Sequence, residues 1–287
     1  MKDKLKKLKY YLRYKFISDE KYIKYKFKKR FGYTLDFHNP QTINEKIQWL
    51  KLYDRSKTHT LCADKFKVRE YIKEKIGEQY LIPLIFETKN PSDINKEKLP
   101  DYPCVVKVNH SRGAFLIKDK NTVDFKSIQK ILTKELNTNF YFRTREWQYK
   151  NIVPRIVVEK MLLDPNGNPP IDYKIWCMNG KVIMFQVDTG SKGNHIITFL
   201  DPSWKTLPFK KNYPVDENVI CPSNLKEMIT IAEKLSEDFL FVRVDLYNIN
   251  NSIYFGELTF HPESGFGSFT PFEADYKLGQ MLNLKGK

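Results

Sequence analysis

The chain has 287 residues, 41% of them hydrophobic and 14% aromatic, which allows a substantial buried core and excludes an intrinsically disordered chain. No apolar run approaches the roughly 20 residues of a membrane-spanning helix, and the first residues are too charged for a signal peptide, so we expect a cytoplasmic protein. The four cysteines are far apart and form no CxxC pair, which indicates small buried residues instead of a zinc site or a disulfide framework.

The net charge of +15 is concentrated at the start of the chain, where residues 1–30 hold thirteen Lys or Arg against three Asp or Glu. Apolar side chains recur there at helical spacing: Leu5, Leu8, Leu12 and Phe16. This pattern predicts a basic amphipathic helix, and Ser18 and Gly32 predict the start and end of a second helix. Such helices can lie on an anionic membrane surface or bind nucleic acid, or they can be a solvated face packed on their own domain.

Helices and one strand are predicted over the rest of the first third of the chain. Thr42 and Glu45 match a capping box, which predicts a helix from Ile43 to about Tyr53. A second segment with helical periodicity predicts a helix from Leu61 to Ile76, followed by a short buried strand over residues 80–86.

The next segment pairs a lysine-containing strand with a polar turn. Residues 104–109 form a predicted strand that holds Lys107 among apolar neighbours, and a turn with Gly113 leads into a second strand, Ala114 to Ile117. A hairpin with a polar, glycine-containing tip can fold over phosphates and present backbone N–H groups and a lysine to them. The segment has neither a GxGxxG nor a Walker pattern, and a lone lysine in a strand more often occupies an ordinary edge-strand position.

The middle of the chain is predicted to form helices, a single strand and then a meander. Helical sequence over residues 121–150 precedes a strand that ends in the charged pair Glu159 and Lys160. Three strands follow, over residues 171–180, 181–190 and 195–201. Asp172 and Lys174 lie on one face of the first of them, because strand side chains alternate. An amphipathic helix from Leu225 to Glu237 then leads into the last pair of strands.

The last pair of strands is predicted to place two carboxylates on one face of a hairpin. If Asn250, Asn251 and Ser252 form its loop, the facing pairs are Ile249 with Ile253, Tyr247 with Phe255, and Asp245 with Glu257. Opposed like charges about 5 Å apart are destabilising, so we expect a cation between the acids, and Mg²⁺ suits carboxylate and phosphate oxygens. Arg243 could neutralise an anion held by that metal, or it could bridge Asp245 and leave a merely solvated face.

Read as a set, these segments resemble the ATP-grasp superfamily and, more narrowly, its TupA-like branch. The resemblance runs in order through residues 39–55, 63–72, 146–160, 172–181 and 241–267. It implies an α+β fold in which the antiparallel sheets of two lobes sandwich ATP, preceded by a helical N-terminal segment. The expected divisions are a basic helical segment over 1–60, a pre-ATP region and first ATP-grasp lobe over 61–163, and a second lobe with the metal site over 164–287.

The resemblance also implies roles for individual residues. Nucleotide-binding positions would be Lys65, Arg69, Lys107, Asn109, His110, Ser111 and Gly113, and, in the segment that joins the lobes, Glu159, Lys160, Met161 and Leu162. Asp245 and Glu257 would hold Mg²⁺, and Arg243 would stabilise developing charge. Thr259 stands where the superfamily usually has asparagine, so its hydroxyl or water would have to complete the metal coordination.

Two further residues are candidate contacts of the acceptor substrate. Lys174 is the first, together with Asp172 on the same strand. His261 lies in the loop after the hairpin and could be either a general base near neutral pH or a residue that only packs.

The resemblance implies an ATP-dependent carboxylate–amine ligase of bacterial surface polysaccharide or teichuronopeptide-type biosynthesis, acting through an acyl phosphate. Its cofactors would be ATP and Mg²⁺. Its substrates would be a carboxylate and an amine, one of them glycan-linked, and the protein would contact the inner face of an anionic membrane peripherally. The alternative is a glycosyltransferase of capsular or cell-surface polysaccharide, although no two aspartates stand two positions apart as in the Asp-x-Asp of one such class. Nucleic acid is not an expected partner, despite a pI near 9.4, because it would leave the paired acids unexplained.

Overall fold

The computed structural model describes residues 2–111, 113–191 and 194–285. Its described helices are α1 (Lys2–Phe16), α2 (Asp19–Phe31), α3 (Ile43–Tyr53), α4 (Lys57–Ala63), α5 (Val68–Lys75), α6 (Phe125–Leu136), α7 (Tyr141–Thr144), α8 (Leu225–Ser236) and α9 (Glu273–Met281). Its described strands are β1 (Leu84–Thr88), β2 (Cys104–Val108), β3 (Ala114–Ile117), β4 (Ile156–Lys160), β5 (Asp172–Met178), β6 (Lys181–Ser191), β7 (Asn194–Leu200), β8 (Phe241–Ile249) and β9 (Ser252–Thr259). Arg112, in the predicted phosphate-covering turn, lies outside the described residues.

The N-terminal helices start and stop where the sequence predicts. The Ser18 side chain accepts a hydrogen bond from the Lys21 N–H at the start of α2, and Gly32, at φ +85°, ends that helix. Thr42 and Glu45 form both hydrogen bonds of the capping box at the start of α3. In the part of the chain that the structure describes, no helix is both long and apolar enough to cross a bilayer.

The prediction of one continuous helix from Leu61 to Ile76 is wrong, because two short helices, α4 and α5, occupy this segment. Asp64 ends α4, and its carboxylate accepts hydrogen bonds from the N–H groups of Phe66 (2.9 Å) and Lys67 (3.3 Å). A side chain that satisfies nearby backbone donors in this way competes with helix continuation. The break gives Lys65 a position in a turn between the two helices.

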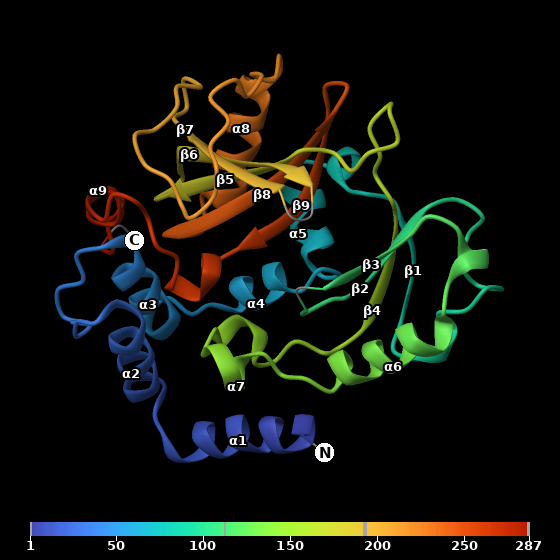
Figure 1. Ribbon diagram of the computed structural model, residues 1–287, viewed down its shortest axis with the longest axis horizontal. Coiled ribbons are helices and arrows are strands. Elements are labelled where there is room, and N and C mark those ends of the chain that lie inside the picture. The colour runs from blue at the N-terminus through green and yellow to red at the C-terminus, as the bar shows by residue number, and fades with distance from the viewer. Residues whose placement is uncertain (1, 112, 192–193, 286–287) are drawn as a thin grey trace.

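The small sheet has the strand order β1-β4-β2-β3, and all of its described pairings are antiparallel. The predicted hairpin is confirmed, with Lys107 on β2 opposite Ala114 on β3. One face of the sheet packs against α6 through a buried apolar cluster that includes Val106, Leu132 and Val158 (Figure 1). Because strand side chains alternate, Lys107 and Glu159 project from the opposite face.

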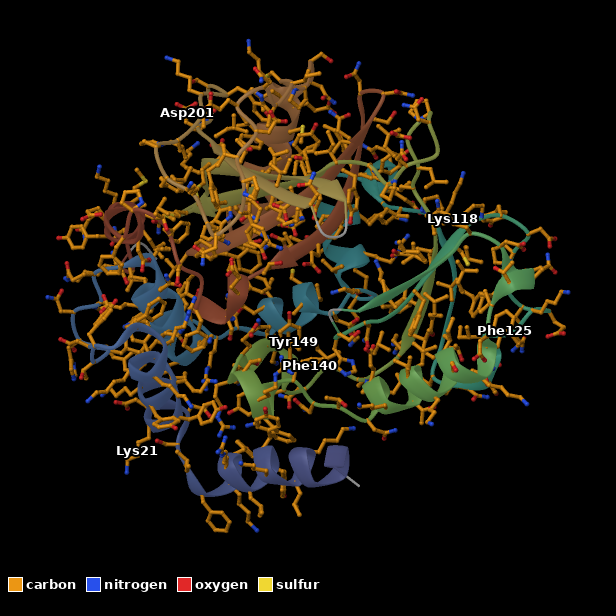
Figure 2. The ribbon with its side chains drawn as sticks, viewed as in Figure 1. Lys21, Lys118, Phe125, Phe140, Tyr149 and Asp201 are labelled. Carbon is orange, nitrogen blue, oxygen red and sulfur yellow. The ribbon has the colours of Figure 1, made fainter. Side chains whose placement is uncertain are left out.

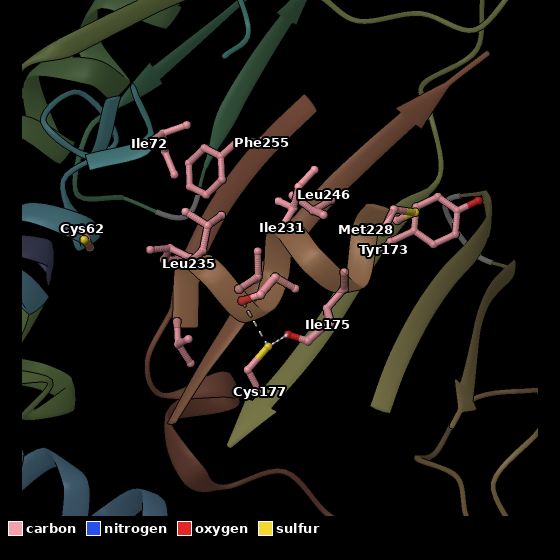
Figure 3. Close-up of a cluster of buried hydrophobic side chains, with 14 of the residues drawn as sticks. Cys62, Ile72, Tyr173, Ile175, Cys177, Met228, Ile231, Leu235, Leu246 and Phe255 are labelled. Atoms are coloured by element: carbon pink, nitrogen blue, oxygen red, sulfur yellow. Dashed lines mark hydrogen bonds between the residues drawn. The ribbon is translucent and has the colours of Figure 1, made fainter. Parts of the chain in front are cut away.

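The large sheet has the order β7-β6-β5-β8-β9 and contains the predicted meander. Helix α8 covers one face, where Met228, Ile231 and Leu235 pack on Ile175 and Leu246 (Figure 3). At one end of the other face, α3 and α9 pack on side chains such as Trp176 and Phe241. The remainder of that face, with its charged residues, stays available for a site. The prediction that all four cysteines are buried is wrong for one of them, because Cys221 is exposed whereas the other three are buried.

The β8–β9 hairpin confirms the central pairing and corrects the turn. Asp245 faces Glu257 as predicted, but Tyr247 faces Tyr254 and Ile249 faces Ser252. The turn has only two residues, Asn250 and Asn251, which both have positive φ, and a bulge between Asp245 and Leu246 compensates for the shorter loop. Gly256 lies at this bulge, where a Cβ would come within 3.0 Å of the Asp245 carbonyl oxygen.

Candidate active site

A cleft of about 310 Å³ separates the small sheet from the charged part of the large sheet. Lys107, Gly113 and Glu159 line it on the side of the small sheet, and Asp245 and Glu257 line it on the side of the large sheet. The end of β4 and the segment that follows it also line the cleft, and all four predicted contacts there are part of the lining: Glu159, Lys160, Met161 and Leu162.

The cleft lining combines apolar and charged side chains. Ile82, Val105 and Leu116 join Met161 and Leu162 in the apolar part of the lining. Backbone hydrogen bonds hold the connecting segment in place, since Lys160 N–H donates to the Pro83 carbonyl and Met161 N–H to the Pro103 carbonyl, both at 3.0 Å. A flat apolar ring with an anionic tail is the kind of ligand that this arrangement can accommodate.

On the small sheet, Lys107 is held by Glu159 from the neighbouring strand. The Lys107 Nζ lies 2.5 Å from Glu159 Oε2, and Arg69 approaches the other carboxylate oxygen at 3.6 Å. Arg69 also donates a hydrogen bond to the Ile82 carbonyl oxygen at 2.9 Å. The ion pair orients the lysine ammonium into the cleft, where it can bind a phosphate oxygen.

On the large sheet, Arg243 and the two facing acids form one network. Arg243 donates two hydrogen bonds to Asp245, from Nε at 2.7 Å and from a terminal nitrogen at 2.5 Å, and a third to Thr259 Oγ1 at 3.1 Å. Lys65 Nζ donates to Glu257 Oε2 at 3.0 Å, and Thr259 donates to Glu257 Oε1 at 3.1 Å. The predicted bridge between Arg243 and Asp245 is therefore present in the structure, within a larger cluster of charges.

Burial and charge act differently on the two acids. Asp245 is 4% exposed, and burial raises its pKa to about 8 although Arg243 opposes this shift. The Glu257 side chain is 39% exposed, and Lys65 and Arg243 outweigh its burial and lower its pKa. The large sheet therefore presents one deeply buried carboxyl group and one more accessible carboxylate at the same cleft.

The donor set at the facing acids suits Mg²⁺ together with a phosphorylated ligand. Among the described residues, no cluster of three or more His, Cys, Asp or Glu side chains could hold a metal ion by itself. Mg²⁺, however, is commonly held by one or two carboxylates and completes its shell with water and substrate phosphates. Asp245 and Glu257 could supply the carboxylates and Thr259 a hydroxyl oxygen.

Three predicted nucleotide contacts, Asn109, His110 and Ser111, do not line the cleft. The Asn109 side-chain amide donates to Asp64 (2.9 Å) and the Val153 carbonyl (3.0 Å), and the backbone carbonyl oxygen of Asn109 accepts from the Lys65 N–H at 3.0 Å. Asn109 therefore positions the turn that carries Lys65.

The other two side chains of this turn face α6 and the segment that follows it. His110 Nε2 lies 2.9 Å from the Thr138 carbonyl oxygen, and Ser111 donates to Glu135 at 2.9 Å. Burial lowers the pKa of His110, because the charged imidazolium would lose its hydration.

Lys174 lies beside the acids but between two other carboxylates. In the sheet it stands opposite Asp245, and its ammonium pairs with Asp172 at 3.1 Å and with Asp188. Burial would lower the pKa of Lys174, but these two carboxylates outweigh burial and raise it. Burial also raises the pKa of Asp172, which lines the cleft and has one carboxylate oxygen without a hydrogen-bond partner.

His261 is buried away from the cleft lining. Its Nδ1 lies 3.1 Å from Gln148 Nε2, which donates to it, and 3.9 Å from a carboxylate oxygen of Glu146. Burial and the nearby charge of Lys51 lower its pKa well below the usual value. In this position the side chain packs against residues that follow α7, so a different group would have to act on an acceptor in the cleft.

Sequence reasoning missed three polar residues on α3 that hold the loop after β9. The Asn44 amide donates to the Gly267 carbonyl, Gln48 donates to the carbonyls of Ser264 and Gly265, and Lys51 donates to both oxygens of Ser264. Their spacing of four and three residues places them on one helix face next to Ile47 and Leu50. Polar residues at that spacing beside a predicted apolar stripe were the signal available in the sequence.

Comparisons with known proteins identify a family and several solved structures to which the chain is similar. The family model described as TupA-like ATPgrasp matches residues 45–283. The structure is similar to that of D-alanine–D-alanine ligase from Bacillus anthracis, with 17% sequence identity, a TM-score of 0.45, and coverage of 77% of this chain and 66% of that ligase. It is also similar to that of an L-amino acid ligase from Bacillus licheniformis, with 15% identity, a TM-score of 0.47, and coverage of 85% and 55%.

This chain therefore spans no more than about two thirds of either ligase. No curated protein matches its sequence.

Proposed function

Since the chain belongs to the TupA-like ATP-grasp family, we propose that it is an ATP-dependent ligase that joins a carboxylate to an amine. The observation that carries the proposal is the pair Asp245 and Glu257, facing each other across β8 and β9 with Lys65 and Arg243 beside them. Lys107 lines the same cleft from the other sheet. This set of charges matches what a metal-bound triphosphate requires, with two carboxylates for the metal and several cations for the phosphates.

In the proposed complex, the base of ATP lies against the apolar side chains of Met161 and Leu162, and the phosphates lie near Lys107 and Lys65. Asp245 and Glu257 would hold Mg²⁺, which supplies positive charge to the phosphate oxygens when bound. The lobes would be residues 61–163 and 164–287, with the basic helical segment 1–60 in front of them. Arg69 would act on the phosphates indirectly, by holding Glu159 and through it Lys107.

The proposed reaction has two steps. A carboxylate oxygen of the first substrate attacks the γ-phosphorus of ATP, the bond to the β-phosphate oxygen breaks, and an acyl phosphate and ADP form. The amine of the second substrate then attacks the acyl carbon, loses a proton and expels phosphate, which leaves an amide. Arg243 would stabilise the oxyanion of this second step, since a preorganised cation acts most strongly where charge develops.

We also propose that one substrate is part of a bacterial surface polysaccharide or a teichuronopeptide-type polymer. Support comes from the TupA-like character of the sequence over residues 45–283. The polar strip beside the acids, with Asp172, Lys174 and Asp188 on neighbouring strands, offers hydrogen-bond partners for a polar acceptor.

Peripheral attachment to an anionic membrane is a further part of the proposal. The side chains of Leu8, Leu12 and Phe16 are 52%, 42% and 77% exposed and recur every fourth residue of α1. They form an apolar stripe on a basic helix, which is the pattern of helices that lie on anionic bilayers. Replacing all three with Ser should reduce sedimentation with phosphatidylglycerol vesicles, whereas Ile220→Ser, at another exposed apolar residue, should not; equal binding of both variants would remove this part.

A ligand-dependent melting experiment tests the core of the proposal. A ligand at a hundredfold excess over its Kd stabilises the folded state by about 2.7 kcal/mol, so ATP with Mg²⁺ should raise the melting temperature, and UDP-sugars should not. Stabilisation by a UDP-sugar and not by ATP with Mg²⁺ would favour a glycosyltransferase and overturn the ligase proposal. Mass spectrometry of reactions that contain ATP, Mg²⁺ and panels of uronic acids and amino acids would then identify the amide product.

A further inference from the structure

A second cavity, of about 280 Å³, lies between the N-terminal helices, α7 and the loop that follows β9. Its lining includes Tyr10 and Arg13 from α1, Lys26 from α2, Arg143 from α7, and Glu263, Ser264 and Phe266 from the loop. The acid in this lining, Glu263, is paired with Lys211. Helix α7 lies between α1 and the rest of the molecule (Figure 2). Phe140, which precedes this helix in the chain, and Tyr149, which follows it, pack with their ring centroids 6.5 Å apart. The hydroxyl of Tyr22 ties α2 to α7 by donating to the Arg143 carbonyl oxygen at 3.1 Å.

The three cations of this cavity have no anionic partner among the described residues. No ion pair or hydrogen bond of the Arg13, Lys26 or Arg143 side chains joins them to the described part of the chain. The nearby Arg145 differs, since it is fully buried and pairs with Asp19 at 3.4 Å. Like charges gathered around one cavity repel each other, so an anion that binds there relieves the repulsion as well as forming new contacts.

The loop that forms one wall is held in an unfavourable conformation. Glu263 and Ser264 have φ values of +48° and +59°, and Gly265 continues the left-handed run at +66°. For residues other than glycine this conformation is unfavourable, because the Cβ comes too close to the following carbonyl oxygen. Buried Gln48 and Lys51 hold the loop through its carbonyl oxygens, at distances of 2.6 to 3.0 Å. Strain that the surrounding structure maintains in this way is concentrated at ligand sites in proteins.

The same loop connects the cavity to the candidate active site. Thr259, which accepts a hydrogen bond from Arg243, is four residues before Glu263, and four residues of chain span at most about 14 Å. The Glu263 carboxylate pairs with Lys211, whose Nζ lies 5.9 Å from the ring centroid of Trp176. Trp176 stands opposite Arg243 in the sheet. A ligand that extends from Arg243 past this loop could therefore reach the cavity.

We propose that this cavity binds a phosphate group, or a pyrophosphate, on the acceptor substrate whose reactive end lies at Arg243. Arginine guanidinium groups match phosphate oxygens in a two-pronged geometry, and Arg13 and Arg143 provide two of them from different helices. At about 30 Å³ for each water molecule, the cavity holds the volume of about nine waters, which leaves room for a pyrophosphate or a sugar phosphate. The assignment of this group to the acceptor rests on the proposed ligase function, whereas anion binding itself does not.

Calorimetric titration with inorganic pyrophosphate tests the binding. All variants carry Lys65→Gln and Lys107→Gln, so that binding at the nucleotide cleft is removed. The cavity variant adds Arg13→Gln, Lys26→Gln and Arg143→Gln; the matched control adds the same loss of charge at three exposed lysines of α1 and α2 that do not line the cavity, Lys15→Gln, Lys21→Gln and Lys28→Gln.

The parent, which carries only Lys65→Gln and Lys107→Gln, should bind one pyrophosphate. The Kd of the cavity variant should be at least tenfold higher than that of the parent, and the Kd of the control should lie within threefold of it. Equal weakening in both variants would mean general attraction to a basic surface and would overturn the proposal, as would no binding to the parent. Sedimentation with phosphatidylglycerol vesicles separates the source of the phosphate. A vesicle-binding defect of the cavity variant alone assigns the phosphate to a lipid headgroup, and equal vesicle binding by both variants assigns it to a soluble acceptor.

The ligase proposal has its own readout, so the two can fail separately. The cavity and control substitutions, placed in the chain with intact Lys65 and Lys107, should leave the rise in melting temperature with ATP and Mg²⁺ unchanged. If that rise occurs but pyrophosphate does not bind, the cavity proposal fails alone. If pyrophosphate binds but ATP with Mg²⁺ has no effect, the ligase proposal fails and the cavity remains an anion site of another activity.

Discussion

The pair formed by Arg243 and Asp245 gives the sharpest test of the site. Replacing Arg243 with Lys keeps the positive charge but allows one hydrogen bond to Asp245 in place of the two parallel ones, at 2.7 and 2.5 Å. Replacing it with Met removes the charge as well. Both variants leave Asp245, which is 4% exposed, with fewer partners than it has now.

The two substitutions should differ in size. A hydrogen bond to a charged group contributes about 1.5–3 kcal/mol, so Arg243→Lys should lower the free energy of unfolding by about that amount. Removing one partner of a buried ion pair costs about 3–5 kcal/mol, so Arg243→Met should lower it by that larger amount. Asp245→Asn combined with Arg243→Met should cost less than the sum of the two single substitutions, because the uncompensated carboxylate is then absent.

Urea unfolding at pH 9 without nucleotide or metal measures all four variants against the parent, because Asp245, whose pKa burial raises to about 8, is mostly ionised at that pH. A double-mutant cycle yields the coupling between the two residues. Equal destabilisation by Lys and Met would show that the hydrogen-bond geometry contributes nothing, and a change under 1 kcal/mol for Met would show that Asp245 does not depend on Arg243. Either result would refute the claim that Arg243 stabilises the buried Asp245 through its charge and its two hydrogen bonds.

Three further predictions concern other residues. Lys51→Met should lower the free energy of unfolding by about 3 kcal/mol in urea, because it leaves buried oxygens of the strained loop without their donor; a loss under 1 kcal/mol would contradict this role. Lys107→Met should raise the Kd for ATP with Mg²⁺ by roughly 10- to 150-fold, because it removes a hydrogen bond between charged groups that contributes about 1.5–3 kcal/mol. In the same titration, Lys118→Met, at an exposed residue (Figure 2), should leave the Kd within twofold of the parent value. Burial holds the pKa of His110 below 6.5 in the folded chain, so below that pH the unfolded chain binds more protons than the folded chain. The free energy of unfolding should therefore fall as the pH drops from 6.5, by up to about 1.4 kcal/mol per pH unit. His110→Gln should show a shallower fall between pH 7.5 and 5.5 in urea unfolding, and an identical slope would rule out this source.

The hairpin illustrates how far local pattern reaches. Alternation along β8 and β9 together with a three-residue turn predicts Asp245 opposite Glu257, and the structure has them opposite each other through a two-residue turn and a bulge. The turn was predicted one residue too long, because the bulge at Gly256 changes the register between the acids and the turn. A bulge depends on close backbone contact with Asp245, which no local propensity reveals.

The turn after β2 illustrates the opposite case. Its polar residues and glycine predict a phosphate-covering loop, yet Asn109, His110 and Ser111 bind partners brought in by α6 and by the break between α4 and α5. Those partners lie between 24 and 45 residues away along the chain. The sequence pattern describes the polarity of the turn, and packing decides which way each side chain points.

By itself, the sequence determined the helix caps and the alternation of side chains along each strand, since backbone sterics and hydrogen bonding between near neighbours govern both. Only the tertiary structure decided that Lys65 meets Glu257 across 192 residues and that Arg13, Lys26 and Arg143 surround one cavity. Such meetings depend on how whole helices and sheets pack against each other, and this is set by the sum of many distant contacts and by no local stretch of the chain.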